Sequence, residues 1–272
     1  KVNNQGVEIM FYATPVKVGD FKWDMSFNFA KNQNKVVELN TGTDNLRLTS
    51  LFGVSLEARV GEAYGTIMGY DYVYDDNGNK ITDGGFYVTT DEVVPLGSVL
   101  ADFTGGVSST FSYKGLSLFV LFDFQKGGSL FSLSNQWGKY SGTLAETVGN
   151  NALGNSIRDD VADGGGVLVD GVVGTQDTDG NWTSDGTANT TYIDAQSHFF
   201  LNQGYILNAA DVYDASFVKF REARLSYTFP NKWFAKTSFR DLSLSIVGRN
   251  LAILSKNIPN VDPEAAISSG NV

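Results

Sequence analysis

The sequence predicts an all-β fold in which antiparallel strands form part of a transmembrane β-barrel. Large apolar and polar side chains alternate in several stretches, which is the period-2 pattern of strands with two unlike faces. The 272 residues include 30 glycines and 13% aromatic residues but only 5 prolines, a composition typical of sheet proteins. Short turns also alternate with long polar connections, as they do in barrels that span membranes.

The composition excludes several functional classes. The chain has no cysteine and one histidine, His198, which we expect to be structural. This excludes disulfides, thiolate metal sites and multi-histidine metal centres. The net charge of −10 argues against nucleic acid as a partner, because phosphate contacts need clustered Lys and Arg. The longest strongly apolar run, residues 118–122, is far shorter than the ~20 residues of a membrane-spanning helix, whereas a β-strand crosses with ~9–11.

About eight strands follow from the alternation. We expect them near residues 7–18, 21–31, 46–60, 64–74, 103–113, 116–126, 215–229 and 240–254. The clearest is Phe21–Phe29, in which every odd position is large and apolar and every even position is polar. No amphipathic helix longer than a turn or two is expected. Because a barrel of about eight strands is filled by its own side chains, these polar strands should form an open sheet with two free edges.

The two faces of these strands suit lipid on one side and water on the other. In the strand 21–31 the large side chains should face lipid: Phe21, Trp23, Met25, Phe27 and Phe29. The polar side chains Lys22, Asp24 and Asn28 should face the lumen. Arg249 of the last strand should join them and pair with carboxylates outside this chain. A soluble sheet with one wet face would show the same alternation.

The connections fall into two groups. Gly19-Asp20 and Lys114-Gly115 are two-residue turns, which are expected on the periplasmic side of a barrel. Residues 134–212 form one long stretch rich in Gly, Asp, Asn and Thr, which we expect to be an extracellular loop region. Apolar islands within it, such as 167–169 and 199–201, predict local strands and a docking surface for a second protein.

Few residues are candidates for metal binding, substrate binding or catalysis. Asp177, Asp179 and Asn181 have the alternating oxygens of a weak candidate for structural calcium, and no other metal or cofactor is expected. Trp137 and Tyr140 begin the long loop region and are candidates for substrate binding, by stacking on sugar rings or peptide side chains. Packing against a neighbouring loop or a lid protein is the alternative for these two rings. We find no catalytic constellation and expect no enzymatic activity.

The stretch from Tyr213 to Pro230, YDASFVKFREARLSYTFP, closely resembles the C-terminal signature of the SusC/RagA-like TonB-dependent outer-membrane transporters. Shorter matching stretches follow in the family's order: Gly6–Ile9, Phe21–Trp23, Asn32–Val36, Gly61–Gly65, Tyr113–Leu118, Gly248–Leu251 and Asp262–Glu264. The ordered set is more specific than any one motif.

The resemblance implies that residues 1–272 are a C-terminal β-barrel segment, about the C-terminal third of a plugged barrel of about 22 strands. The plug domain and the first half of the barrel would then be absent from this chain. The family imports large nutrients, glycans or oligopeptides, across the bacterial outer membrane. The implied partners are a SusD-like lid lipoprotein, outer-membrane lipid, and TonB acting through the missing N-terminal part. A soluble or secreted β-rich carbohydrate-binding module and a passive porin are the alternatives.

Overall fold

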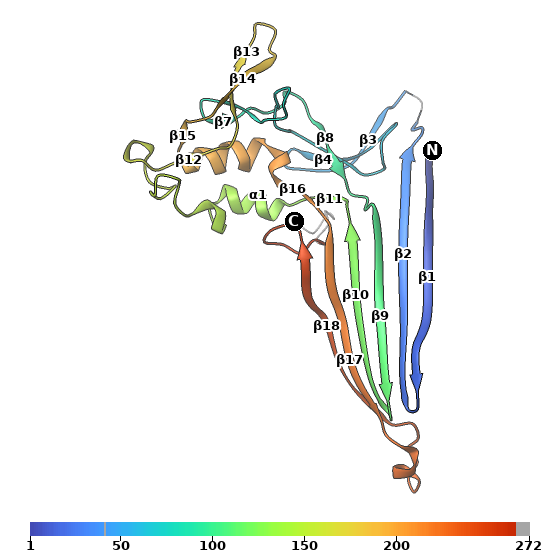
Figure 1. Ribbon diagram of the computed structural model, residues 1–272. Coiled ribbons are helices and arrows are strands. Elements are labelled where there is room, and N and C mark those ends of the chain that lie inside the picture. The colour runs from blue at the N-terminus through green and yellow to red at the C-terminus, as the bar shows by residue number, and fades with distance from the viewer. Residues whose placement is uncertain (41, 265–272) are drawn as a thin grey trace.

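The structure, a computed structural model, describes residues 1–40 and 42–264, without the side chains of residues 201–205. Its main feature is a six-stranded antiparallel sheet with the order β1-β2-β9-β10-β17-β18 (Figure 1). The bounds of its strands are Val2–Val18 (β1), Phe21–Val36 (β2), Phe103–Tyr113 (β9), Leu116–Lys126 (β10), Phe217–Thr228 (β17) and Ser243–Lys256 (β18). Each strand has at least 11 residues, enough to cross a bilayer.

The six-stranded sheet is open, as expected. Strands β1 and β18 lie at its two edges, and within the described part of the chain they do not pair with each other. Each edge therefore presents backbone donors and acceptors to which another strand can bind.

The short and the long connections of this sheet lie at opposite ends of its strands. The turns Gly19-Asp20 and Lys114-Gly115, and the connection 229–242, lie at one end, which we call the turn end. All longer connections lie at the other, which we call the loop end (Figure 1). Lys114 and Gly115 both have positive φ, 47° and 86°. This is the backbone of a type I′ turn, whose twist matches that of the strands it joins.

The expectation that residues 46–60 and 64–74 are strands of the barrel wall is wrong. β2 pairs directly with β9, so the wall has six strands here rather than about eight. The intervening residues form a second sheet of four short strands at the loop end, in the order β3-β4-β5-β8. Their bounds are Asn45–Leu51 (β3), Val54–Arg59 (β4), Thr66–Gly69 (β5) and Val94–Ser98 (β8).

Burial explains the error. A turn at Phe52-Gly53 divides the first of the two expected strands, and both of its residues have positive φ. β5 is buried at every position, so its two faces do not differ in the way that wall strands do. The core beneath this second sheet contains Val54 and Ile67 together with Phe131 and Leu133. The last two residues follow the wall strand β10 in the sequence.

The stretch 134–212 contains many short elements of regular structure at the loop end (Figure 1). Its strands are β12 (Val167–Leu168), β13 (Val172–Gln176), β14 (Trp182–Ala188) and β15 (Tyr192–Ile193). β13 and β14 join β6 (Ile81–Asp83) and β7 (Phe86–Tyr87) in one sheet, and β11 (Ser129–Phe131) pairs with β16 (Val212–Asp214). The island 167–169 thus contains a local strand, β12, as predicted.

Two helices in this stretch were not expected from the sequence. Helix α1 spans Leu133–Tyr140, and its N-cap Ser132 accepts a hydrogen bond from the backbone N–H of Asn135. A π-helix spans Ser197–Ile206 and includes the island 199–201, which was expected to be a strand. No helix in the described residues is long and apolar enough to span a bilayer.

Asn208 ties the loop-end elements together. Its side chain is fully buried, and its Oδ1 accepts a hydrogen bond from the backbone N–H of Tyr70, at 3.1 Å. Its Nδ2 donates to the carbonyl oxygen of Phe52 at 3.5 Å. One amide thus satisfies backbone groups at the end of β5 and at the β3–β4 turn.

Candidate functional site

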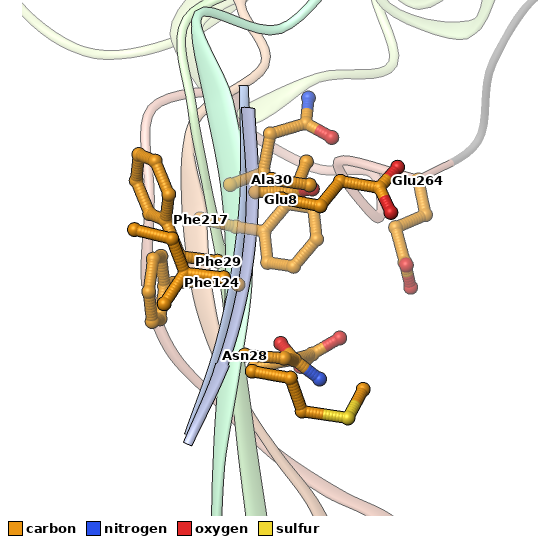
Figure 2. A pocket seen from close by; sticks show the side chains of 13 residues that line it. Glu8, Asn28, Phe29, Ala30, Phe124, Phe217 and Glu264 are labelled. Carbon is orange, nitrogen blue, oxygen red and sulfur yellow. The ribbon is translucent and has the colours of Figure 1, made fainter. Parts of the chain in front are cut away.

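The first candidate site is the polar face of the six-stranded sheet. Antiparallel register places Asn28, Gly106, Asp123 and Lys219 opposite one another in one row across β2, β9, β10 and β17. Directly paired residues lie on the same face of a sheet, so these four residues identify the polar face. Figure 2 shows Asn28 and Glu264 on one side of the sheet and the ring of Phe29 on the other.

The opposite face is aromatic and apolar. One row joins Trp23, Phe111, Leu118 and Leu225, and the Trp23 and Phe111 rings stack with centroids 5.7 Å apart. Further rows contain other aromatic pairs and a cluster near the turn end: Phe122–Phe220, Phe29–Phe103, Tyr227–Phe229, Phe229–Trp233 and Phe229–Phe234. The segregation of faces predicted from the alternation is therefore present across the sheet.

The residues predicted to face the lumen all lie on the polar face. Lys22 and Asp24 form an ion pair of 2.7 Å, and the Asp24 carboxylate also accepts a hydrogen bond from Thr14. Arg249 pairs with Glu222 on the neighbouring strand, Nε to Oε2 at 3.2 Å. This pair leaves 76% of the Arg249 side chain exposed, and the expectation that Arg249 also pairs with carboxylates outside the chain stays a prediction. That this face borders a lumen stays a prediction.

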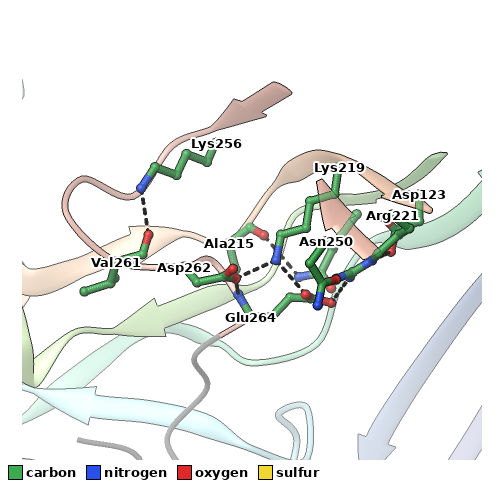
Figure 3. Close-up of polar contacts among 10 residues, drawn as sticks. Asp123, Ala215, Lys219, Arg221, Asn250, Lys256, Val261, Asp262 and Glu264 are labelled. Atoms are coloured by element: carbon green, nitrogen blue, oxygen red, sulfur yellow. Dashed lines mark hydrogen bonds and ion pairs between the residues drawn. The ribbon is translucent and has the colours of Figure 1, made fainter. Parts of the chain in front are cut away.

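A network of charged side chains lies near the loop end of the polar face (Figure 3). Lys219 Nζ contacts Asp262 Oδ1 at 2.5 Å and Glu264 Oε2 at 2.6 Å. Arg221 pairs with Asp123, Nε to Oδ2 at 2.6 Å, and also with Glu264. The sequence pattern did not identify this network. Its two basic residues nevertheless lie in the signature stretch 213–230, and two of its acidic residues lie in the matching stretch 262–264.

The network holds the segment 257–264 against the polar face. Lys219 is the buried member, with 5% of its side chain exposed, whereas Asp262 and Glu264 are about half exposed. Ile258 in the same segment is buried against Leu130 and Ala215. Apolar burial at one end of the segment and ion pairs at the other together fix its course over the sheet.

The substitution Lys219→Met should destabilise the docking of this segment by about 1.5–3 kcal/mol, the usual contribution of hydrogen bonds to charged groups. Hydrogen exchange of residues 257–264 in the full-length protein measures the effect. Arg249→Met is the matched control, because the Arg249 side chain is 76% exposed and surface pairs contribute little. Equal protection of the segment in both variants would show that the Lys219 contacts do not hold it.

Trp137 and Tyr140 lie on α1 and pack mainly against other loop-end rings. The Trp137 ring meets Phe52 edge-on at 5.2 Å, and the Tyr140 ring stacks on Phe200 at 4.1 Å. This is the packing alternative of the sequence analysis. Tyr140 and Phe200 also line a hollow of about 530 Å³ together with Arg158, so one edge of this aromatic cluster remains accessible from solvent.

The calcium candidates form a turn that satisfies its own polar groups. Asp177 Oδ1 accepts backbone N–H bonds from Asp179 and Asn181, each at 2.8 Å, and Oδ2 accepts from the Asn181 amide. These hydrogen bonds lower the pKa of Asp177. Asp75 caps the turn 75–79 with the same set of bonds. Within the described residues, no group of three or more His, Asp or Glu side chains could hold a metal ion.

A buried ion pair lies beneath α1. Lys139 Nζ contacts Asp211 Oδ1 at 2.8 Å, with 5% and 0% of the side chains exposed. Burial raises the pKa of Asp211 to about 6, although Lys139 opposes the shift. Burial, with Lys139 nearby, lowers the pKa of His198 to about 4, so this histidine is neutral near pH 7. Nothing in the sequence pattern identified this pair, because the partners are far apart in the chain.

The chain is similar to known receptors. No family model matches it. It is 26% identical to TonB-dependent receptor P3 of Formosa agariphila, over 100% of this chain and 26% of that protein. It is 29% identical to TonB-dependent receptor SusC of Bacteroides thetaiotaomicron, over 58% of the chain and 18% of that protein. The chain thus spans about a quarter or less of the length of these curated relatives.

Two solved structures share the fold. The RagAB peptide importer in its 'open-open' state matches with a TM-score of 0.61 and 21% identity, over 97% of this chain and 26% of that chain. The RagAB peptide transporter matches with a TM-score of 0.59 and 19% identity, over 97% and 27%.

An open antiparallel sheet with one aromatic face, one polar face and sorted connections is a segment of a β-barrel wall, and the match to RagAB bears this out. In sequence the chain is similar to TonB-dependent receptors, including SusC, and in fold it is similar to RagAB. It therefore resembles a segment of a SusC/RagA-like TonB-dependent receptor.

Proposed function

We propose that this chain forms part of the wall and loops of a bacterial outer-membrane transporter that imports a large nutrient, an oligopeptide or a glycan. The observation that carries the proposal is the separation of the two faces across all six strands of the sheet. An aromatic face suits lipid, and a charged face suits a hydrated lumen. The residues that line this lumen would include Lys22, Asp24, Asn28 and Arg249.

The loop end would face the cell exterior. Long connections lie on the extracellular side of outer-membrane barrels and short turns on the periplasmic side, and the two kinds lie at opposite ends here (Figure 1). The hairpin of β13 and β14 projects farthest from the sheet at this end. It would contact a SusD-like lid lipoprotein, and the hollow beside Tyr140 would contact substrate held under that lid.

Energy would come from TonB, which would act through an N-terminal part of the longer protein outside this chain. The relatives are named receptors and transporters, and the proposed role is transport without catalysis. The solved relative is named a peptide importer, which supports oligopeptides, whereas the resemblance of the signature stretches to the SusC/RagA-like family leaves glycans as the second substrate class.

Growth of the source bacterium tests the function. Deleting the full-length gene should abolish growth on oligopeptides or on glycans as the limiting nutrient and leave growth on amino acids and monosaccharides unchanged. The intact gene restored on a plasmid should reverse the defect. Normal growth of the deletion strain on both polymers would contradict the proposal. A full-length protein that stays monodisperse without detergent would favour the soluble binding module instead.

The lid contact has its own test. The lipoprotein should co-purify with the intact receptor from a detergent extract and be recovered poorly when residues 172–188, the β13–β14 hairpin, are replaced by a short Gly-Ser linker. The matched control shortens the turn-end connection 229–242, which lies at the opposite end of the sheet. Equal recovery with the intact receptor and the hairpin variant would exclude this hairpin from the contact.

A further inference from the structure

A polar groove of about 720 Å³ lies where β2 separates from β9 near the loop end. The pairing of these two strands ends at Ala30 and Thr104, whereas β2 continues beside β1 as far as Val36. The groove is lined by the free part of β2, the neighbouring part of β1, Ser98 and residues 100–103.

The chemistry of the aromatic face changes abruptly at this groove. Phe29 and Phe103 form the last aromatic pair, with ring centroids 5.4 Å apart. The next positions of β2 on the same face are Lys31, Gln33 and Lys35, because alternate residues of a strand share a face. Their partners on β1 are Val7, Gln5 and Asn3, in that order. Two cations and three amides thus replace an aromatic surface within the length of a single strand.

The two lysines are available for a ligand. Both are exposed, and neither forms an ion pair with another of the described residues. Among the described residues that line the groove, Asp102 supplies the one carboxylate. It lies against Gly127, where an added Cβ would be 2.4 Å from Asp102 Oδ2. The chain as a whole has a net charge of −10. The positive charges of Lys31 and Lys35 therefore form a local exception on an acidic protein.

We infer that this groove binds the phosphorylated sugar headgroup of a glycolipid in the outer leaflet of the membrane. The inference rests on the proposed function, which places the aromatic face in lipid and the loop end outside the cell. The acyl chains would then lie along the Phe29 and Phe103 side of the wall. Lys31 and Lys35 would contact phosphate as point charges, and the amides would hydrogen-bond to sugar hydroxyls.

Lipid binding to the purified full-length receptor tests the inference. The receptor in detergent is titrated with a diphosphorylated glucosamine glycolipid, with the same lipid after dephosphorylation, and with inorganic phosphate. The double variant Lys31→Gln/Lys35→Gln should bind the phosphorylated lipid about tenfold more weakly than the natural protein, a loss of about 1.4 kcal/mol. Lys232→Gln/Lys236→Gln is the matched control, because it removes the same charge from exposed positions at the turn end.

The outcomes separate the explanations. Equal affinity of the natural protein and the Lys31/Lys35 variant would overturn the inference, as would equal losses in the two double variants. Equal binding of the phosphorylated and dephosphorylated lipids would overturn it too, since the lysines would then only extend to the membrane surface. Inorganic phosphate competing as well as the lipid would identify a free phosphate site instead. If binding fails while nutrient uptake persists, only this inference falls and the proposed function stands.

Discussion

The substitution Val120→Arg is expected to lower the free energy of unfolding of the full-length receptor in lipid vesicles by about 2–4 kcal/mol. Val120 lies near the middle of β10 on the aromatic face, opposite Ser109 on one side and Ala223 on the other. A guanidinium at that position would face hydrocarbon, where it loses its hydration and has no ionic partner. Denaturant titration followed by gel mobility of the folded barrel measures the loss.

Leu121→Arg is the control for this prediction. Leu121 is the next residue of β10 and is half-buried like Val120, but it shares the polar face with Ser108 and Glu222. The same substitution there should cost less than about 1 kcal/mol, because the new charge meets water and a carboxylate. Equal costs at the two positions would mean that the two faces do not have different surroundings.

The substitution Lys139→Met should destabilise the loop-end region by about 3–5 kcal/mol at pH 8, because it leaves Asp211 as a buried charge without its partner. Limited proteolysis of the stretch 141–196 and urea unfolding measure this loss. Lys126→Met is the control, since the Lys126–Asp214 pair spans 3.7 Å with side chains 56% and 42% exposed. Its loss should cost less than about 1 kcal/mol.

The effect of Lys139→Met should depend on pH in a defined direction. The folded-state pKa of Asp211 is raised from 3.8 to about 6, so the folded state binds this proton more tightly than the unfolded state does. The contribution of Asp211 to stability therefore falls as pH rises from about 4 to about 6. Loss of Lys139 raises the pKa further, so the variant should lose less stability at pH 5 than at pH 8. A loss independent of pH would contradict this account of the pair.

The wall of the barrel could be predicted from the sequence because each of its strands has two unlike faces. Alternation in Phe21–Phe29 predicts both the strand and the face of each side chain. The turns Gly19-Asp20 and Lys114-Gly115 set the register of their strands through local backbone geometry. These signals are contained within about ten residues of sequence and do not depend on what the strand packs against.

The loop end was less predictable because its structure depends on contacts between distant residues. β5 is buried on both faces, so it lacks the alternation of a wall strand. Asn208 binds backbone groups of Phe52 and Tyr70, and no local pattern reports such a contact. The ion pairs of Lys139 and Lys219 likewise join residues more than 40 positions apart.

The most direct test of the account asks which face of the sheet meets water. The chain has no cysteine, so single cysteines can be placed on β2 and β9 of the full-length receptor in intact outer membranes. Cysteine at Ser26, Asn28 or Ser108, on the polar face, should react readily with a small polar maleimide. Cysteine at Met25, Phe27 or Val107, on the aromatic face, should resist it and react with a lipid-soluble maleimide instead. Equal labelling of the two sets, or the reverse preference, would contradict the assignment of the aromatic face to lipid and of the polar face to a transport lumen.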